Sequence, residues 1–241
     1  MSRLSNSLFA FLLVSFLTGT ALAGPKLQIP ETTFNFGRVP QQVIVTHGFW
    51  LKSVGDDTVR ISSINTGCGC TQIPLEDSTI APGDSLQMQI VLNTGRYRGY
   101  VSKKPQFISN ASDQPTVLRI YAEAITNPNE TTLVAVRPVV LDLSQHSPEP
   151  VMTGKIALQN TAGEEVNVKP TDTSSAEFTV TVPGSIPADE SGDIVVTLND
   201  SAIETSFARS ITIEVTSSSE RATYSIPVFR RYEPNGSEAG E

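Results

Sequence analysis

Apolar and polar residues alternate with a period of two along most of the chain. The clearest runs cover residues 86–92, 178–182 and 211–215. Because side chains alternate between the two faces of a strand, each run places its apolar members on one sheet face. Turn-forming clusters such as 54–57 and 81–84 separate these runs. Short alternating strands between such turns predict an all-β fold of the sandwich type.

The strand pattern recurs at one spacing along the chain. Gly55 and Gly163 lie 108 positions apart. The apolar sets beginning at Leu86 and Ile194, and those beginning at Leu118 and Ile226, have the same separation. Chance agreement between alternating strands is the alternative, and agreement at three separate elements favours a duplication over it.

The repeat predicts two tandem immunoglobulin-like domains of about 100 residues each. We place them at residues 24–126 and 131–232, on either side of the polar linker 126–130, and expect a disordered tail over 233–241. The repeat spacing carries Cys68 to Ala176 and Cys70 to Phe178. The second domain therefore keeps the strands and lacks the cysteines.

Residues 1–23 have the pattern of an export signal. Arg3 precedes an apolar run over 8–17, and Ala21-Leu22-Ala23 forms a small-residue cleavage site before Gly24. The run is shorter than a membrane span, and no later stretch is apolar enough to cross a bilayer. An uncleaved anchor is the alternative. We expect an exported protein, located in the periplasm or at the cell surface or beyond it.

Charge narrows the possible partners. The chain carries 17 Lys and Arg against 25 Asp and Glu, a formal net charge of −8. Nucleic-acid binding needs a basic face, so this balance argues against a nucleic-acid partner. An envelope protein or a glycan remains as the expected partner.

The candidate chemistry lies in one short segment, Gly67-Cys68-Gly69-Cys70-Thr71, which holds both cysteines of the chain. A disulfide is the first interpretation. On an extended strand the two α-carbons would lie about 6.5 Å apart, near the limit for a bridge, and Gly69 could bend the chain to close that gap. Closing so short a loop stabilises the fold by only about 1.6 kcal/mol, so such a disulfide would contribute little to stability.

Metal binding and thiol exchange are the other two interpretations. Two thiolates suit Cu(I), whereas structural zinc needs four ligands and the chain offers only His47 and His146 as imidazoles. Thiol–disulfide exchange is the least favoured, because no basic residue lies in the loop and the nearest in sequence is Arg60. Cu(I) is therefore the cofactor that the sequence permits, if it binds any.

Three segments resemble a known bacterial family. They are Phe34-Asn35-Phe36-Gly37-Arg38-Val39, the cysteine segment 67–71, and Ile80-Ala81-Pro82-Gly83. Over residues 26–125 the chain resembles the exported family known as domain of unknown function number 1573. After Val39 the chain departs from that pattern, since Pro40-Gln41-Gln42 replaces the common glycine turn.

The resemblance implies an immunoglobulin-like sandwich of the ASPM–Hydin type and supplies no activity. It also separates structural motif residues from those that support the cysteine loop. The motif residues are Phe34, Phe36, Gly37, Pro82 and Gly83, and the loop residues are Gly67, Gly69 and Thr71.

Other candidates have ordinary explanations. We expect Trp50 and Met88 to pack in the core, His47 to be an ordinary strand residue and His146 to be solvated. The basic–aromatic run 96–100 could contact an anionic glycan or lipid surface, and a solvated loop beside an edge strand is the simpler interpretation.

No nucleophile motif such as G-x-S-x-G occurs in the sequence. The sequence therefore predicts a non-catalytic binding or structural module of the bacterial cell envelope. The alternative is a Cu(I)-binding or thiol-redox protein that acts through Cys68 and Cys70.

Overall fold

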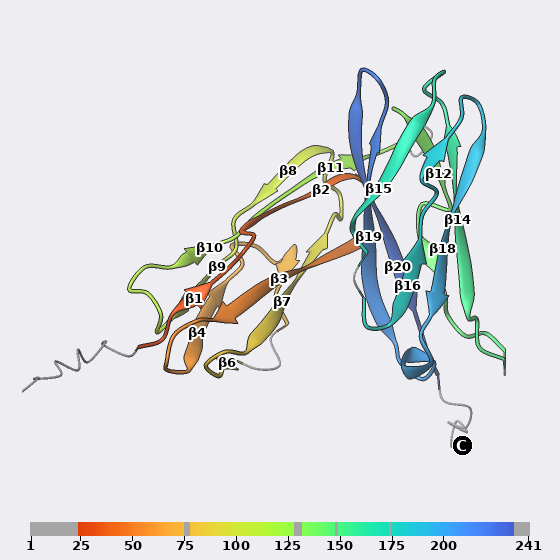
Figure 1. Ribbon diagram of the computed structural model, residues 1–241. Helices are drawn as coiled ribbons and strands as arrows, with labels where there is room; N and C mark the ends of the chain where they lie inside the picture. Colours follow the sequence, from red (N-terminus) through yellow and green to blue (C-terminus); the bar gives the residue numbers. More distant parts are fainter. Residues whose placement is uncertain (1–23, 75–77, 128–131, 148, 174, 234–241) are drawn as a thin grey trace, which may run out of the picture.

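The computed structural model describes residues 24–74, 78–127, 132–147, 149–173 and 175–233. The predicted export signal, most of the linker and nearly all of the tail lie outside these residues. The described chain forms two β-sandwiches that lie side by side, with one short 3₁₀ helix (Figure 1). The predicted all-β fold with two tandem sandwiches is confirmed. The exact domain boundaries stay predictions.

Among the described residues between 27 and 125, eleven strands build the first sandwich. They are β1 (Leu27–Gln28), β2 (Thr33–Pro40), β3 (Ile44–Ser53), β4 (Val59–Asn65), β5 (Thr71–Gln72), β6 (Thr79–Ile80), β7 (Ser85–Asn93), β8 (Gly99–Lys103), β9 (Gln106–Ser109), β10 (Thr116–Val117) and β11 (Arg119–Ile125).

In the second sandwich, the part of 134–230 that the structure describes forms nine strands and the helix η1. They are β12 (Val134–Arg137), β13 (Leu141–Asp142), β14 (Thr153–Asn160), β15 (Val166–Asp172), β16 (Phe178–Thr181), β17 (Ser185–Ile186), β18 (Ser191–Leu198), η1 (Asp200–Ala202), β19 (Phe207–Thr216) and β20 (Arg221–Arg230).

The two sandwiches share one plan of strand pairing. The sheet β1-β3-β7-β5 of the first corresponds to β12-β14-β18-β16 of the second. The antiparallel pairs of β4 with β6 and β9 correspond to those of β15 with β17 and β19. The pair of β8 with β11 corresponds to that of β19 with β20, so the long strand β19 matches β8 and β9 together. The parallel pair of β2 with β11 corresponds to that of β13 with β20.

Each sandwich has its own hydrophobic core, because the period-two pattern turns one apolar set inward from each sheet. Phe36, Phe49 and Met88 are completely buried in the first core, as expected for Met88. Phe178 and Ile194 belong to the second core. The family-motif residue Phe34 also lies in the first core, while Pro82 and Gly83 form the turn before β7.

Trp50 was predicted to be buried, and that prediction is wrong: its side chain is 50% exposed. On β3 the neighbours Phe49 and Leu51 point inward and are buried, so the alternation of the strand forces Trp50 outward. An apolar run inside a strand does not reveal which of its members faces the core.

The sandwiches meet through buried polar contacts between β2 or β3 and β19 or β20. The Ser225 hydroxyl donates to the carbonyl of Phe36 at 2.7 Å, and the Thr46 amide donates to Ser210 Oγ at 2.9 Å. Gly37, at φ +64°, allows the closest approach, since a Cβ there would lie 2.2 Å from the carbonyl oxygen of Thr223. The family-motif glycine thus serves the junction between the sandwiches.

Candidate functional site

Cys68 and Cys70 form a disulfide in a tight turn between β4 and β5. Their α-carbons lie 5.3 Å apart, closer than on an extended strand. The turn closes where the Thr71 amide donates to the carbonyl of Cys68, and the left-handed residue is Gly67, at φ +73°. The expected bend is present, and the left-handed backbone that permits it lies at Gly67 rather than Gly69.

Hydrogen bonds fix both ends of the turn. Asn65 Oδ1 accepts from the Gly67 amide at 2.9 Å, and the Thr66 hydroxyl donates to the carbonyl of Cys68 at 3.1 Å. The carbonyl of Cys70 accepts from the Asn93 amide on β7 at 2.8 Å. The backbone of the disulfide turn is therefore held from both sides.

The tip of the turn faces open space. Gly67 and Gly69 are exposed, and a Cβ added at either would meet no atom within 4 Å. The two cysteines are partly exposed, and Thr71 is buried beneath them with its Oγ1 at 3.7 Å from Cys68 Sγ. A reactant can therefore approach the disulfide from the solvent side.

A cation lies beside the disulfide in space, although no basic residue lies in the loop and the nearest in sequence is Arg60. The Tyr97 hydroxyl donates to Cys70 Sγ at 3.3 Å, and Lys103 Nζ donates to that same hydroxyl at 2.8 Å. Tyr97 is itself held, because Gln41 Nε2 donates to its carbonyl at 2.5 Å. Sequence distance hid this contact, because Lys103 lies on β8 and reaches the turn only in the folded sandwich.

The second sandwich has an equivalent turn, but one residue away from the position predicted by the repeat. Asn199, directly after β18, donates its backbone amide to the carbonyl of Glu177, as Asn93 at the end of β7 does to the carbonyl of Cys70. The residue that follows Cys70 and the one that follows Glu177 also occupy matching pairs: Thr71 pairs with Leu92 of β7, and Phe178 pairs with Leu198 of β18. Cys70 thus corresponds to Glu177.

Cys68 accordingly corresponds to Ser175, two residues before Glu177. The predicted partners Ala176 and Phe178 are wrong because connections of unequal length shift the repeat spacing along the chain. The Ser175 hydroxyl donates to the Glu177 carboxylate at 2.6 Å. A hydrogen bond therefore joins the two positions that the disulfide joins in the first sandwich.

The cations of the two sandwiches correspond as well. Lys103 pairs with Ile120 on β11, and Arg209 pairs with Val228 on the equivalent strand β20. Arg209 forms a bidentate ion pair with Glu177, in which Nε lies 3.1 Å from Oε2 and Nη2 contacts Oε1. Each sandwich thus directs a cation from the same strand position toward the same turn.

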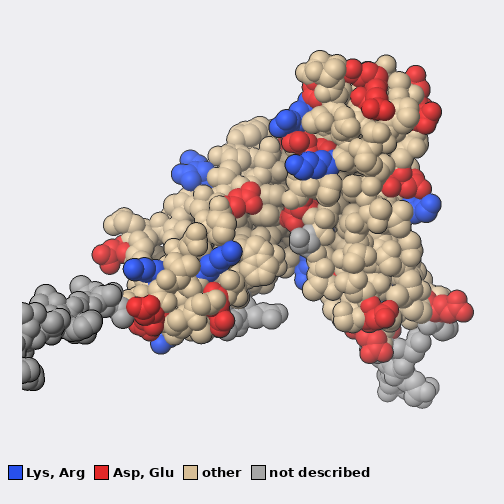
Figure 2. Space-filling model, in the orientation of Figure 1, with Lys and Arg blue, Asp and Glu red and all other residues tan. Residues whose placement is uncertain are grey.

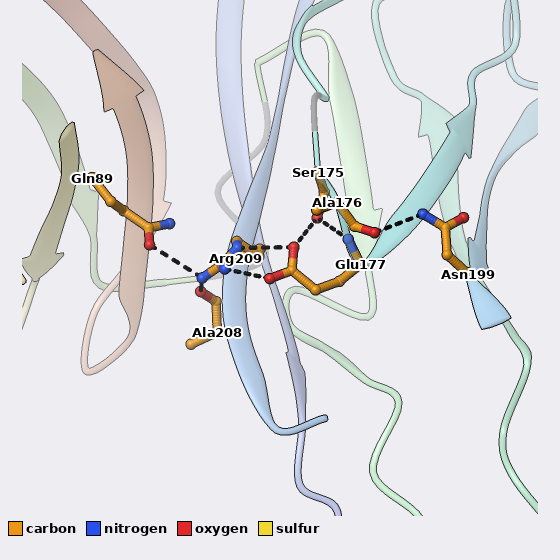
Figure 3. Close-up of polar contacts among 7 residues, drawn as sticks. All are labelled: Gln89, Ser175, Ala176, Glu177, Asn199, Ala208 and Arg209. Carbon is orange, nitrogen blue, oxygen red and sulfur yellow. Dashed lines mark hydrogen bonds and ion pairs between the residues drawn. The ribbon is translucent and has the colours of Figure 1, made fainter. Parts of the chain in front are cut away.

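Arg209 also contacts the first sandwich. Its Nη1 donates to Gln89 Oε1 on β7 at 3.2 Å, so the guanidinium bridges the two sandwiches (Figure 3). Nearby, His47 Nδ1 lies 2.5 Å from Asp172 Oδ2, and the His47 ring stacks on Phe34 at a centroid distance of 3.5 Å. The prediction of an ordinary strand residue at His47 missed this contact between sandwiches.

These contacts line a cleft of about 490 Å³ between the sandwiches. Trp50, Gln87 and Gln89 line it from the first sandwich, and Glu177 and Arg209 from the second. A second hollow of about 480 Å³ lies along the first sandwich and shares Gly48 and Trp50 with the cleft. The half-exposed indole of Trp50 therefore lies between two adjoining hollows.

Gly48 shapes the floor of both hollows. A Cβ at this position would lie 2.4 Å from the side-chain amide of Gln87, so only glycine leaves room for Gln87 to lie across the strand. Sequence reasoning missed this cleft, because its walls come from segments more than 80 residues apart.

Metal binding stays a prediction. The two sulfurs are bonded to each other here, so Cu(I) could use them only after reduction. Within the described residues, no group of three His, Cys, Asp or Glu side chains is placed to hold a metal ion. Among the same residues, no helix is long and apolar enough to cross a membrane.

Charges are dispersed over the face drawn in Figure 2, where Lys and Arg lie among acidic side chains over the first sandwich. Acidic side chains gather toward the two ends of the second sandwich. On that face, the described residues form no continuous basic patch, in keeping with the net charge of −8.

Solved structures with a similar course of the chain include a protein of unknown function from Porphyromonas gingivalis W83. It has 12% sequence identity and a TM-score of 0.35, with 85% of this chain and 99% of that chain covered. A PapD-like domain of human CEP192 has 9% identity and a TM-score of 0.38, with 52% of this chain and 99% of that chain covered. A search of curated proteins gave no match.

The family resemblance inferred from the Phe-x-Phe-Gly and Cys-Gly-Cys-Thr motifs is confirmed over the first sandwich. Residues 27–124, which span the first sandwich, match the family model described as "Protein of unknown function (DUF1573)".

Proposed function

We propose that the protein is a non-catalytic binding module exported to the bacterial cell envelope, and that its ligand lies against Trp50 in the cleft between the sandwiches. The observation that carries this proposal is the half-exposed indole between two adjoining hollows. Large apolar side chains are normally buried, so an exposed indole in a concave, partly polar surface is a feature of binding sites.

The chemistry around Trp50 suits a glycan. A sugar ring has an apolar C–H face, which can lie on an aromatic ring, and a rim of hydroxyl groups that need hydrogen-bond partners. The side-chain amides of Gln87 and Gln89 lie on one side of Trp50, and Lys52 and Glu31 line the hollow on the other. An extended chain of sugars could contact both sets while one ring stacks on the indole.

The walls of the cleft are already positioned for a ligand. The Arg209–Glu177 ion pair, with Gln89 bonded to Arg209, ties the second sandwich to the floor of the cleft. The His47–Asp172 contact ties the sandwiches together a second time. A site whose side chains are held in place loses less conformational entropy on binding.

Intrinsic fluorescence tests this proposal directly, because Trp50 is the only tryptophan in the chain. We expect a β-1,4-linked N-acetylglucosamine tetramer, used as the probe, to change the Trp50 emission with a saturable dependence on concentration. In calorimetric titrations, Trp50→Ala should weaken binding at least tenfold, or about 1.4 kcal/mol.

The matched control is Tyr100→Ala, which removes an aromatic ring that is 73% exposed and does not line the cleft. It should leave the affinity unchanged. Equal loss of binding in both variants would place the site elsewhere. If a panel of soluble glycans neither alters the Trp50 emission nor gives a heat of binding, the proposal fails.

A further inference from the structure

The disulfide turn carries an inference that is independent of the cleft. We propose that Cys68–Cys70 is a reversible redox pair that oxidises a dithiol of a partner protein, with Cys70 leaving as the thiolate. Three observations support it: the open tip of the turn, the hydrogen-bonded cation beside Cys70, and the equivalent carboxylate at Glu177 in the second sandwich.

The comparison between the sandwiches identifies Cys70 as the sulfur that carries the charge. At the equivalent position Glu177 is an anion, and the cation Arg209 from the equivalent strand position pairs with it. In the first sandwich Lys103 takes the place of Arg209 and reaches Cys70 through the Tyr97 hydroxyl. The first sandwich therefore provides a cation beside a sulfur that can become negatively charged only after reduction.

Reduction would give Cys70 the negative charge that Glu177 carries at the equivalent position. A thiolate is a stronger hydrogen-bond acceptor than a disulfide sulfur, so the bond from Tyr97 gains strength when Cys70 is released. The Lys103 ammonium polarises the Tyr97 hydroxyl and offsets the negative charge. Stabilising the reduced form makes a disulfide a better oxidant. The disulfide closes a loop of only a few residues, so the chain entropy that reduction restores is small and the loop length has little influence on the equilibrium between the reduced and oxidised forms.

The proposed reaction is a two-step exchange. A thiolate of the partner attacks Cys68 Sγ, which forms a mixed disulfide, breaks the Cys68–Cys70 bond and leaves the electron pair on Cys70. The second thiolate of the partner then attacks the partner's first sulfur, which is bonded to Cys68 in the mixed disulfide. This step forms the disulfide of the partner and releases Cys68, which takes up a proton. The partner dithiol loses two electrons and the cysteine pair gains them.

Attack at Cys68 agrees with the shape of the turn. Cys68 lies between the two exposed glycines, and a Cβ added at either would meet no atom of the described residues within 4 Å. Cys70 is instead covered on one side by Tyr97 and anchored to β7 through its carbonyl. The accessible sulfur is thus the site of attack, and the supported sulfur is the leaving group.

A glutathione titration tests the proposal. The purified protein is equilibrated in buffers of rising ratio of reduced to oxidised glutathione, alkylated and weighed by mass spectrometry. We expect Tyr97→Phe and Lys103→Met each to shift the equilibrium constant about three- to tenfold toward the disulfide form. Reduction by dithiothreitol should slow in the same two variants.

Lys104→Met is the matched control, since Lys104 is an exposed neighbour of Lys103 whose side chain makes no hydrogen bond to the turn within the part of the chain that the structure describes. It should keep the wild-type midpoint. Unchanged Trp50 emission in all variants verifies the fold of the first sandwich. Wild-type midpoints in both Tyr97→Phe and Lys103→Met would overturn the proposal, as would a wild-type disulfide that stays intact at every glutathione ratio.

Single-cysteine variants test which sulfur carries the charge. The thiolate absorbance near 240 nm should persist to lower pH in Cys68→Ser, which keeps Cys70, than in Cys70→Ser. The opposite order would contradict the assignment of Cys70 as the leaving group.

Discussion

The turn at Cys68–Cys70 and the turn at Ser175–Glu177 occupy the same place in two sandwiches of one plan. Each links its first and third residue, by a disulfide in the first sandwich and by a hydrogen bond in the second. Each lies next to a cation from the same strand position, Lys103 or Arg209. The scaffold is shared, and the chemistry placed on it differs.

The difference is between an ion pair, which redox conditions do not alter, and a disulfide, which can be reduced. Arg209 pairs with Glu177 in the second sandwich and donates to Gln89 in the first, so this contact ties the two sandwiches together. The disulfide is covalent, partly exposed and acquires a charge only on reduction. The second turn should therefore matter most for stability, and the first for reactivity.

The largest expected effect on stability comes from Glu177→Ala. Glu177 is only 13% exposed, and its loss leaves Arg209 without its carboxylate at the junction. We expect the free energy of unfolding to fall by about 2 kcal/mol, less than for a fully buried pair because Arg209 is partly exposed. Urea unfolding followed by circular dichroism measures it.

The exposed pair Lys155–Asp193 supplies the control for that measurement. Asp193→Ala should cost less than about 0.5 kcal/mol, because solvent screens exposed ion pairs. Equal losses at Glu177 and Asp193 would show that the junction ion pair has no special role.

Removing the disulfide should have a smaller effect. The double variant Cys68→Ala/Cys70→Ala should lose no more than about 1.6 kcal/mol, since the chain-entropy gain of so short a loop is small. Unfolding of the wild type with and without dithiothreitol checks the same quantity without mutation. A loss greater than that of Glu177→Ala would reverse the contrast between the two turns.

Exchanging the cations should affect the second turn more than the first. Arg209→Lys loses the bidentate geometry with Glu177 and should lower the free energy of unfolding by about 1 kcal/mol. Lys103→Arg keeps a cation beside Tyr97 and should change it by less than about 0.5 kcal/mol. Chemical denaturation of the two single variants compares them, and similar losses would contradict the proposed division of roles.

The smallest effect concerns Glu164, in the turn before β15. The pKa of Glu164 is lowered by a hydrogen bond from the Ser218 hydroxyl, then by Ser217, and also by the Ser218 amide. A lowered pKa contributes stability above the unfolded value, and this is lost as pH falls through the folded value. Ser218→Ala should raise the pKa of Glu164 toward its ordinary range in a carboxyl NMR titration. Ser219→Ala is the control and should leave the titration unchanged.

The strand pattern predicted much of this fold because period two is a local property. Met88, Ile90 and Leu92 alternate along β7, and all three are buried. The repeat likewise revealed two sandwiches. It misplaced the partner of Cys70 by one residue, because connections between strands differ in length and a single spacing cannot follow them.

The sequence located the disulfide segment, since both cysteines lie there, but not its surroundings. Tyr97 and Lys103 are 27 and 33 positions from Cys70. Tyr97 lies in the loop between β7 and β8 and Lys103 on β8, and strand pairing in the folded sandwich brings both to the turn. The exposure of Trp50 escaped prediction for a related reason: alternation places neighbours on opposite faces without naming the buried face.

The sequence by itself determined the all-β class, the two-fold repeat of the strand pattern and the place of the cysteine pair. These follow from local alternation and from residues adjacent in the chain. The tertiary structure alone decided that a cation lies beside Cys70 and that Glu177 is the counterpart of Cys70 in the second sandwich. It also decided that Trp50 lies in a cleft between the sandwiches. Such contacts join distant segments, so they depend on strand pairing and side-chain packing, which no local pattern specifies.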